Sequence, residues 1–535
     1  MNSFMKKIVI TLSLSIFAIG LNNILHAQKN PKILNWYNGK GAGMQTEKAY
    51  KKLKKKTSNT VVVAVIDSGI DIEHEDLKGK IWTNEKEIPN NGIDDDNNGF
   101  IDDIHGWNFI GNTEGEHVDG ATLEKTRILR ELSKKYKDID PKTINDSDKE
   151  EFALYEKVKK EVQDDIDNYS QYLPQYEMLP MMIEKVPVKV AEILGVEEYT
   201  EKDLKKWKPE SDQEKQLKGI ATAILTGELS LESIAEQKKQ ITDMLDFHLN
   251  TEFDEREIIG DKPNDFSDIN YGNNDVEGPD ALHGTHVGGI IGAIRGNKLG
   301  GDGVADNVKL MVLRAVPNGD ENDKDIALSI RYAVDNGAKI INMSFGKSYS
   351  PNQKEVYEAF KYADSKGVLL VHAAGNSSLD LDVEDNFPTA KYTFQEEKLD
   401  LYLTIGASTR FKKQKLAAEF SNYGQTMVDV FAPGHDIYNS VPQSEYKKLN
   451  GTSMAAPMVA GVGALLTSYF PTLTMNEIKD IILKSATPYK ETKQFKPGTD
   501  ELVDFATLSV TGSVVNVKNA VKMCFELEKA KAEKK

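Results

Sequence analysis

The stretch that most constrains the fold of this chain runs from Asn450 to Leu466. Gly451 and Thr452 precede Ser453, and almost all the residues that follow are small or apolar. This pattern predicts a tight turn that opens into a buried helix, with Ser453 in the first turn at the positive end of the helix dipole. Pro457 fits this prediction, because proline is tolerated near the start of a helix. Taken alone, serine at such a position is also an ordinary N-cap.

Two other stretches place polar residues next to buried elements. An apolar run from Val61 ends at Asp67 and a turn, which is typical of a central parallel strand that presents a carboxylate at its carboxyl end. His283 opens a second run of small residues, which predicts another buried helix with His286 one turn further on.

These stretches, in the order Asp67, His283 and Ser453, resemble the catalytic segments of the subtilisin-like serine proteases, the subtilases of peptidase family S8. The resemblance implies an α/β fold with a doubly wound, mainly parallel sheet. It also implies that the first histidine, His283, takes the proton of Ser453 as that residue attacks a peptide carbonyl. Asp67 would hold the imidazole in the right tautomer, and an acyl-enzyme would form and be released by water.

The resemblance gives a role to Asn376, which follows a buried strand expected over residues 367–374. In the family this asparagine donates its amide to the oxyanion that develops on the scissile carbonyl. An asparagine after a glycine is, by itself, most often a turn former.

A third segment, Ser344, Phe345 and Gly346, follows a buried strand expected over residues 338–343. In subtilases the corresponding residues line the substrate cleft and pair with the substrate backbone as an added strand. Without the resemblance, Ser-Phe-Gly is an ordinary exit from a strand.

An acid-rich loop follows the first strand. Asp94, Asp96 and Asn98 alternate before a glycine, and Asp102 comes further on, as in the early positions of a calcium loop. His105 stands where such a loop has its last acidic ligand, so the loop is at best a shortened relative. A structural calcium ion and a solvated acidic turn both remain open, and no cofactor is expected in the chemistry.

Between the strand expected to end at Asp67 and the helix expected at His283, the composition changes. Glycine almost vanishes over residues 112–253, and Lys and Glu alternate with apolar residues at helical spacing. We therefore expect a long helical insertion between the catalytic aspartate and histidine. It could be a lid, a substrate-docking arm, a partner surface or an inert packed lobe.

The amino-terminal residues predict export. Lys6 and Lys7 precede an apolar run that is followed by Ala27, which is typical of a secretory signal peptide. We expect an extracytoplasmic product without a membrane anchor, whether periplasmic, surface-bound or secreted. Residues 28–59 are too few for the folded propeptide of many subtilases, which leaves the activation route open.

The expected organisation is a signal peptide over 1–27, a short segment over 28–59, catalytic parts over 60–111 and 254–525, the helical insertion over 112–253, and a charged tail over 526–535. The net charge of −17 argues against nucleic acid and anionic membranes as partners, so protein or peptide substrates are expected. The leading hypothesis is an exported serine endopeptidase. The alternatives are a catalytically silent binding protein and a relative that transfers the acyl group to an amine.

Overall fold

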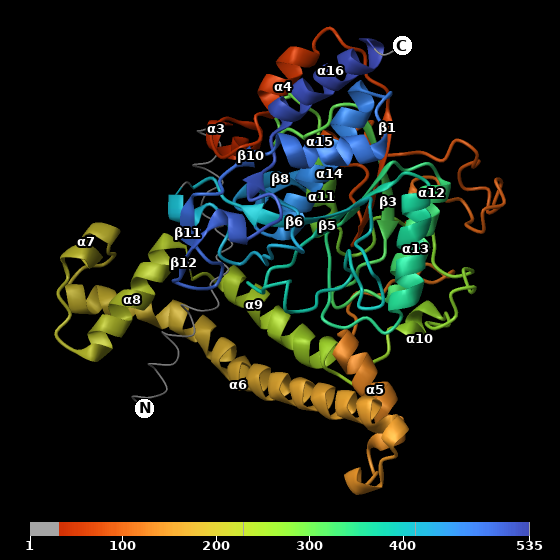
Figure 1. Ribbon diagram of the computed structural model, residues 1–535. Coiled ribbons are helices and arrows are strands. Elements are labelled where there is room, and N and C mark those ends of the chain that lie inside the picture. Colours follow the sequence, from red (N-terminus) through yellow and green to blue (C-terminus); the bar gives the residue numbers. More distant parts are fainter. Residues whose placement is uncertain (1–30, 228, 412, 534–535) are drawn as a thin grey trace. The chain divides into compact units, whose positions relative to one another are not determined.

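The computed structural model describes residues 31–533 apart from 228 and 412 (Figure 1). The signal peptide expected over 1–27 lies outside the described residues. Contacts divide the described chain into two compact units. The smaller is Val162–Asp246, and the larger combines Pro31–Glu161 with Phe247–Lys535.

A nine-stranded sheet forms the centre of the described part of the larger unit. Its strands, in spatial order, are β10 (Thr487–Pro488), β13 (Ser513–Val514), β7 (Val430–Pro433), β6 (Tyr402–Ser408), β5 (Leu369–Ala373), β4 (Ile340–Met343), β1 (Val61–Asp67), β3 (Val308–Arg314) and β2 (Gly106–Asn108). Neighbouring strands are parallel except β10 and β13 at one edge. The doubly wound, mainly parallel sheet expected from the sequence is confirmed.

Helices cover both faces of this sheet (Figure 1). One face carries α4 (Thr46–Leu53), α11 (Leu282–Gly292), α14 (Thr452–Tyr469), α15 (Met475–Ser485) and α16 (Val517–Glu533), and the other carries α12 (Asp323–Asp335) and α13 (Gln353–Ser365). The side chains of β1 alternate between the two layers, with Val63 and Val65 in the first core and Ala64 and Ile66 in the second. Both faces are therefore apolar, as the unbroken apolar run predicts.

The ends of several elements follow from their local sequence. Thr474 caps α15 by accepting a hydrogen bond from Glu477 N, and the Glu477 side chain accepts one from Thr474 N in return. The strand expected at 427–430 begins only at Val430. The charged tail expected from residue 526 is helical over its described part, because α16 continues to Glu533.

The segment before the sheet belongs to the core of the larger unit. It contains α3 (Pro31–Leu34) and a short 3-10 helix, η2 (Trp36–Asn38), and both Trp36 and Tyr37 are buried. Asn439 Nδ2 donates to the Tyr37 hydroxyl at 3.2 Å. Asn439 lies on β8 (Ile437–Val441), which pairs with β9 (Glu445–Leu449) in a hairpin against α11.

The expected insertion contributes helices to both units. The long helix α6 (Lys149–Leu194) runs from the larger unit into the smaller one. The other helical elements of this region are α5 (Glu124–Tyr136), η4 (Pro141–Thr143), η5 (Asp146–Asp148), α7 (Glu201–Lys206), α8 (Asp212–Thr226), α9 (Leu231–Asp243) and the π-helix η6 (Met244–His248), and α10 (Arg256–Ile259) follows it. The smaller unit has small apolar cores of its own, around Val190 and around Ile234.

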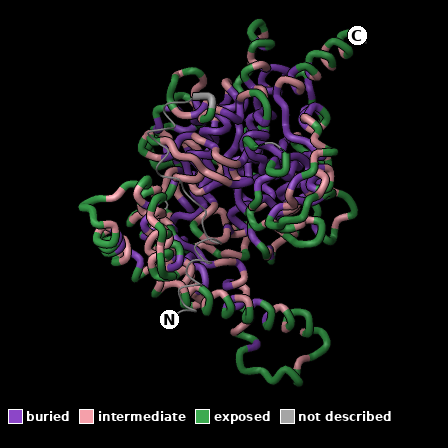
Figure 2. The backbone as a smooth tube through the Cα atoms, turned by 90° about the vertical axis from the view of Figure 1, so that its left-hand side faces the viewer, coloured by how far each residue is buried: buried purple, intermediate pink, exposed green. Residues whose placement is uncertain are grey.

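Short elements complete the larger unit: η3 (Glu75–Leu77), η7 (Lys413–Lys415), β11 (Lys493–Phe495), β12 (Leu502–Asp504) and η8 (Phe505–Thr507). Buried positions gather in the interior, and exposed positions follow the outer loops and helices (Figure 2). None of the helices within the described ranges combines the length and apolar character needed to cross a membrane.

Candidate active site

Asp67 ends the buried strand β1 and is itself buried. Ser68 N donates to Asp67 Oδ1 at 2.9 Å, which fixes the carboxylate at the turn after the strand. The same oxygen accepts a hydrogen bond from His283 Nδ1 at 2.6 Å. The structure therefore brings these two predicted residues into direct contact.

The close approach of α11 to β1 depends on glycine. A Cβ on Gly284 would lie 2.1 Å from the carbonyl oxygen of Gly69 and 3.2 Å from Asp67 Cβ. No side chain fits there, so glycine after His283 is what allows the first turn of α11 to lie against the turn that carries Asp67.

The two histidines of α11 differ in environment. Burial alone would lower the pKa of His283, but the charge of Asp67 and the hydrogen bond to it raise that pKa above its ordinary value. His286 is fully buried, and Nε2 contacts the carbonyl oxygens of Ile437 and Lys447 at 3.0 Å and 3.3 Å. Burial, together with the charge of His283, lowers the pKa of His286 to about 3. His286 is thus a neutral structural residue that anchors the β8–β9 hairpin.

Ser453 is the second residue of α14 and is half-buried. Its hydroxyl donates to the carbonyl oxygen of Ser344 at 3.1 Å, and the Ser344 hydroxyl donates to the carbonyl oxygen of Ser453 at 2.9 Å. The single hydroxyl proton of Ser453 is directed at the expected cleft strand and not at His283.

Asn376 lies beside the start of α14, and its orientation is fixed. Thr452 N and Thr452 Oγ1 donate to Asn376 Oδ1 at 2.8 Å and 3.0 Å. Because a backbone N–H requires an acceptor, these bonds place the Asn376 oxygen toward Thr452 and make Nδ2 the side of the amide that can donate elsewhere. A Cβ on Gly451 would lie 3.5 Å from Ser453 N and 3.6 Å from Asn376 Nδ2, so both donors border the same small space.

The predicted cleft residues follow β4. Ser344 and Phe345 are buried and Gly346 is exposed. His372 Nε2 donates to the carbonyl oxygen of Phe345 at 2.8 Å, which ties this residue to β5. The carbonyl oxygen of Ser344 accepts the Ser453 hydroxyl and therefore faces the start of α14.

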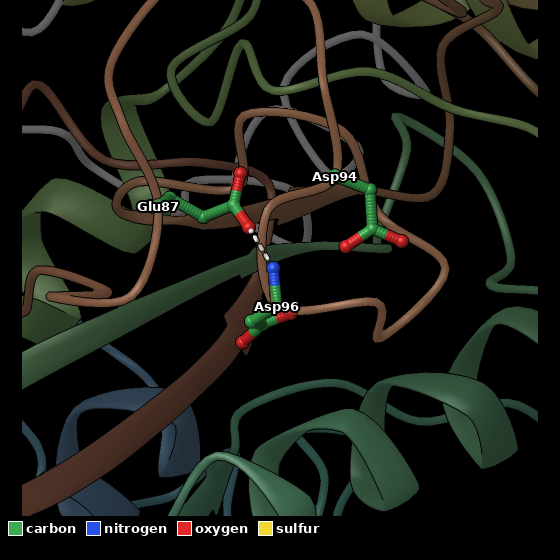
Figure 3. A group of neighbouring side chains, drawn as sticks. All are labelled: Glu87, Asp94 and Asp96. Carbon is green, nitrogen blue, oxygen red and sulfur yellow. Dashed lines mark hydrogen bonds between the residues drawn. The ribbon is translucent and has the colours of Figure 1, made fainter.

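The acid-rich loop brings together two of the residues that the sequence predicts, Asp94 and Asp96, with Glu87. Carboxylate oxygens of Glu87, Asp94 and Asp96 lie within 4.8 Å of one another (Figure 3). Asp102 is not part of this group, and its carboxylate accepts hydrogen bonds from the backbone N–H groups of Asn91 and Gly92 at 3.2 Å and 2.8 Å. It instead closes the loop on itself.

Asn98 is likewise engaged within the loop. Its Nδ2 donates to Asp103 Oδ2 at 2.9 Å, and its Oδ1 accepts from Phe100 N at 2.8 Å. Glu87 Oε1 accepts from Asp96 N at 3.0 Å. The loop's own amides thus donate to these carboxylates, and Glu87, Asp94 and Asp96 lie close enough together to hold a cation.

Two positioning residues are not evident from the sequence pattern. Thr452 orients Asn376, although its place beside Ser453 suggests no more than a helix start. Arg314, buried at the end of β3, donates to the carbonyl oxygen of Ser68 at 3.1 Å and so braces the turn after Asp67. A buried arginine at the end of an apolar strand is the available signal for the second of these.

Comparisons with known proteins point to one family. The family model described as the Subtilase family (Peptidase_S8) matches residues 58–506. The chain is 38% identical over 205 residues to the thermophilic serine proteinase of Bacillus sp. (strain AK1), covering 38% of this chain and 46% of that protein. It is 35% identical over 206 residues to subtilisin DY of Bacillus licheniformis, covering 38% of this chain and 70% of that protein.

Other matches are more partial. The chain is 35% identical over 248 residues to subtilisin-like protease 2 of Plasmodium falciparum, covering 45% of this chain but 17% of that protein. The matched region spans less than half the length of the thermophilic serine proteinase. A solved structure from Pseudoalteromonas arctica PAMC 21717, titled as proteases, aligns with a TM-score of 0.48 at 18% identity over 92% of this chain and 98% of that chain. Because the family model matches most of its length, this chain belongs to the subtilase family of peptidases.

Proposed function

We propose that this protein is a serine endopeptidase that hydrolyses peptide bonds in protein or peptide substrates through Asp67, His283 and Ser453. The observation that carries the proposal is the 2.6 Å hydrogen bond from His283 Nδ1 to Asp67. A neutral imidazole that donates through Nδ1 has its lone pair on Nε2. His283 is thereby set up as a base with its accepting nitrogen directed away from Asp67.

In the proposed reaction Ser453 first leaves its hydrogen bond to Ser344 by rotation about its Cα–Cβ bond. Its proton then passes to His283 Nε2 as Oγ attacks the scissile carbonyl. Asp67 stabilises the imidazolium that forms. The imidazolium gives its proton to the leaving amine as the C–N bond breaks, and water then hydrolyses the acyl-enzyme that remains.

Two donors support the negative charge that develops on the carbonyl oxygen. Asn376 Nδ2 and Ser453 N border the space beside Gly451, and the first turn of α14 directs its positive end there. Because Thr452 holds the Asn376 amide in place, this donor needs no reorganisation during the reaction.

The substrate backbone is proposed to extend the sheet along Ser344–Gly346. The carbonyl of Ser344 faces Ser453 and Gly346 is exposed, so this segment is suited to pair with an added strand. In this structure the Ser453 hydroxyl donates its hydrogen bond to the Ser344 carbonyl. A substrate N–H that pairs with this carbonyl would therefore displace the hydroxyl and release it for attack.

The proposal places the enzyme outside the cytoplasm, on the signal-peptide pattern that ends at Ala27. It also includes calcium in a structural role, held by Glu87, Asp94 and Asp96, with a solvated acidic turn as the alternative. In the proposed mechanism the proton passes between Ser453 and His283, and Asp67 stabilises the imidazolium without taking the proton itself.

An active-serine phosphonate probe, combined with product analysis on a model peptide, tests the proposal. The wild-type protein should be labelled and should yield cleaved fragments. Ser453→Ala should abolish labelling and lower turnover by about 10⁶-fold, the size found when a nucleophile of this kind is removed. Ser365→Ala, at an exposed serine on α13, is the matched control and should behave as wild type.

The possible outcomes separate the competing functions. Joined peptide fragments would indicate acyl transfer instead of hydrolysis. A wild-type protein that is folded but neither labelled nor active would indicate a silent binding protein. Equal labelling of wild type and Ser453→Ala would show that another residue is the nucleophile.

A further inference from the structure

Lys347 follows the expected cleft strand directly, yet its side chain is 2% exposed. Its ammonium group lies 2.6 Å from Glu124 Oε2 and 2.8 Å from Asp323 Oδ1, and it donates to the carbonyl oxygen of Glu321 at 2.8 Å. Burial opposes the charged form, but the carboxylates of Asp323 and Glu124 hold the pKa of Lys347 above its usual value. Lys347 is thus a buried cation with its hydrogen bonds satisfied.

One of these carboxylates comes from the region inserted between the catalytic aspartate and histidine. Glu124 is the first residue of α5, and the oxygen that accepts from Lys347 also accepts from Arg127 Nη2 at 2.8 Å. Arg127 in turn lies 2.9 Å from Glu255. The first turn of α5 is therefore fixed by buried charges and brings a negative charge to the end of the cleft strand.

The backbone of Lys347 extends this link to the other side of the site. Lys347 N donates to the carbonyl oxygen of Phe387 at 2.8 Å, and Phe387 N donates to the carbonyl oxygen of Lys347 at 2.8 Å. The preceding residue, Asn386, donates to the carbonyl oxygen of Ala374, two residues before Asn376. Lys347 thus connects the strand expected to pair with substrate to the segment that carries the expected oxyanion donor.

Because its charge is buried, Lys347 is held in one position relative to its carboxylate partners. Two buried charges offset their desolvation only at good geometry, and the loss of one partner leaves the other uncompensated. A buried ion pair can be purely structural. Here, however, the lysine lies one residue beyond Gly346, so a displacement of its backbone moves the cleft strand itself.

We propose that Lys347 is a positioning residue for extended substrates, held by Glu124 at the start of α5 so that Ser344–Gly346 lies in register with the substrate backbone. This inference rests on the proposed peptidase function. It gives the base of the inserted region a role in substrate alignment that does not require contact with substrate.

The test compares an extended peptide with a small sulfonyl fluoride that reacts with Ser453 without pairing along the cleft strand. Lys347→Met and Glu124→Gln should each lower kcat/KM for the extended peptide by about 10- to 100-fold, the cost of a misplacement near 1 Å. The rate of sulfonylation should stay close to that of wild type. Lys347→Arg keeps the positive charge and should retain more activity than Lys347→Met.

The exposed pair Glu358 and Lys361 on α13 offers the matched control, with Glu358→Gln and Lys361→Met expected to change neither rate. Sulfonylation slowed as much as peptide cleavage would overturn the inference, because it would indicate general disruption of the site. Unchanged peptide kinetics would also overturn it. If Lys347→Met fails to fold, Lys347→Arg and Glu124→Gln decide. A wild-type protein that is inert to both reagents would refute the proposed function instead.

Discussion

Two carboxylates, Asp67 and Asp280, act on the charge state of His283. Although burial opposes protonation, Asp67 and, more weakly, Asp280 raise the pKa of His283. Asp280 is exposed and lies just before α11, where its Oδ1 accepts from Leu282 N at 3.2 Å. Its charge can therefore be removed without removing this acceptor.

We predict that Asp280→Asn moves the acidic limb of the pH profile of kcat/KM to lower pH. The proposed base must be unprotonated, so activity rises as the pH passes upward through the pKa of His283. Loss of a nearby negative charge makes the imidazolium less stable and lowers that pKa. The measurement is a pH profile with a model peptide at low ionic strength.

Asp480→Asn, at an exposed aspartate on α15, is the control for loss of one charge far from the site. The difference between Asp280→Asn and wild type should shrink at high salt, because exposed charges are screened over about 10 Å at 0.1 M. An unchanged profile, or a shift to higher pH, would contradict the assignment of His283 as the titrating base.

The sequence names the groups that would carry the chemistry but misses those that hold them in place. Asp67, His283, Ser453 and Asn376 stand in stretches whose order can be compared with a family. Lys347 acts through a carboxylate 223 residues away in the chain, which no local pattern connects to it. Buried polar partners of this kind become visible only when the fold brings distant segments together.

At the scale of elements, the segment before β1 packs into the core of the catalytic unit. Leu53 and Tyr37 are buried with the helices on one face of the sheet, and Val517 N donates to the carbonyl oxygen of Met44 at 2.9 Å. The sequence shows that this segment is too short for a folded propeptide. The structure adds that its described part is built into the same core as α14 and α16.

We predict that Leu53→Ala lowers the free energy of unfolding by about 2–5 kcal/mol, because it opens a cavity in a closely packed core. Lys52→Ala, at the neighbouring exposed position of the same helix, should change it by less than about 0.5 kcal/mol. Denaturant unfolding in a Ser453→Ala background, which prevents self-cleavage, measures both. Equal stability of the two variants would indicate that this segment is dispensable for the fold.

Element boundaries were predictable where a local signal marks them. The start of α15 at Met475 follows from the capping residues Thr474 and Glu477. The end of α16 was not predictable, because its last two turns are charged and gain support from tertiary ion pairs. Lys56 contacts Glu528 at 2.8 Å and Lys531 contacts Glu477 at 2.7 Å.

At the scale of the whole molecule, the two units differ in the size of their cores. The sheet of the larger unit is buried between two extensive apolar layers. The smaller unit, Val162–Asp246, relies on clusters of only a few buried side chains among its described residues. Composition and helical spacing indicate an inserted helical region, but they do not show that part of it, including α5, belongs to the catalytic unit.

Separate cores imply separate unfolding, and we predict that the full chain opens first within residues 162–246. Ile234→Ala in α9 and Ile478→Ala in α15 remove the same atoms from buried sites, 3% and 0% exposed, in the smaller and the larger unit. Each should cost about 2–5 kcal/mol, but within its own unit. Hydrogen exchange followed by peptide, in a Ser453→Ala background, should show faster exchange over 162–246 for Ile234→Ala with β1 and β3 unaffected. Ile478→Ala should accelerate exchange in the sheet. A local cavity destabilises only the cooperative unit whose contacts it removes. Faster exchange across both units in Ile234→Ala would therefore mean that they unfold as one cooperative body.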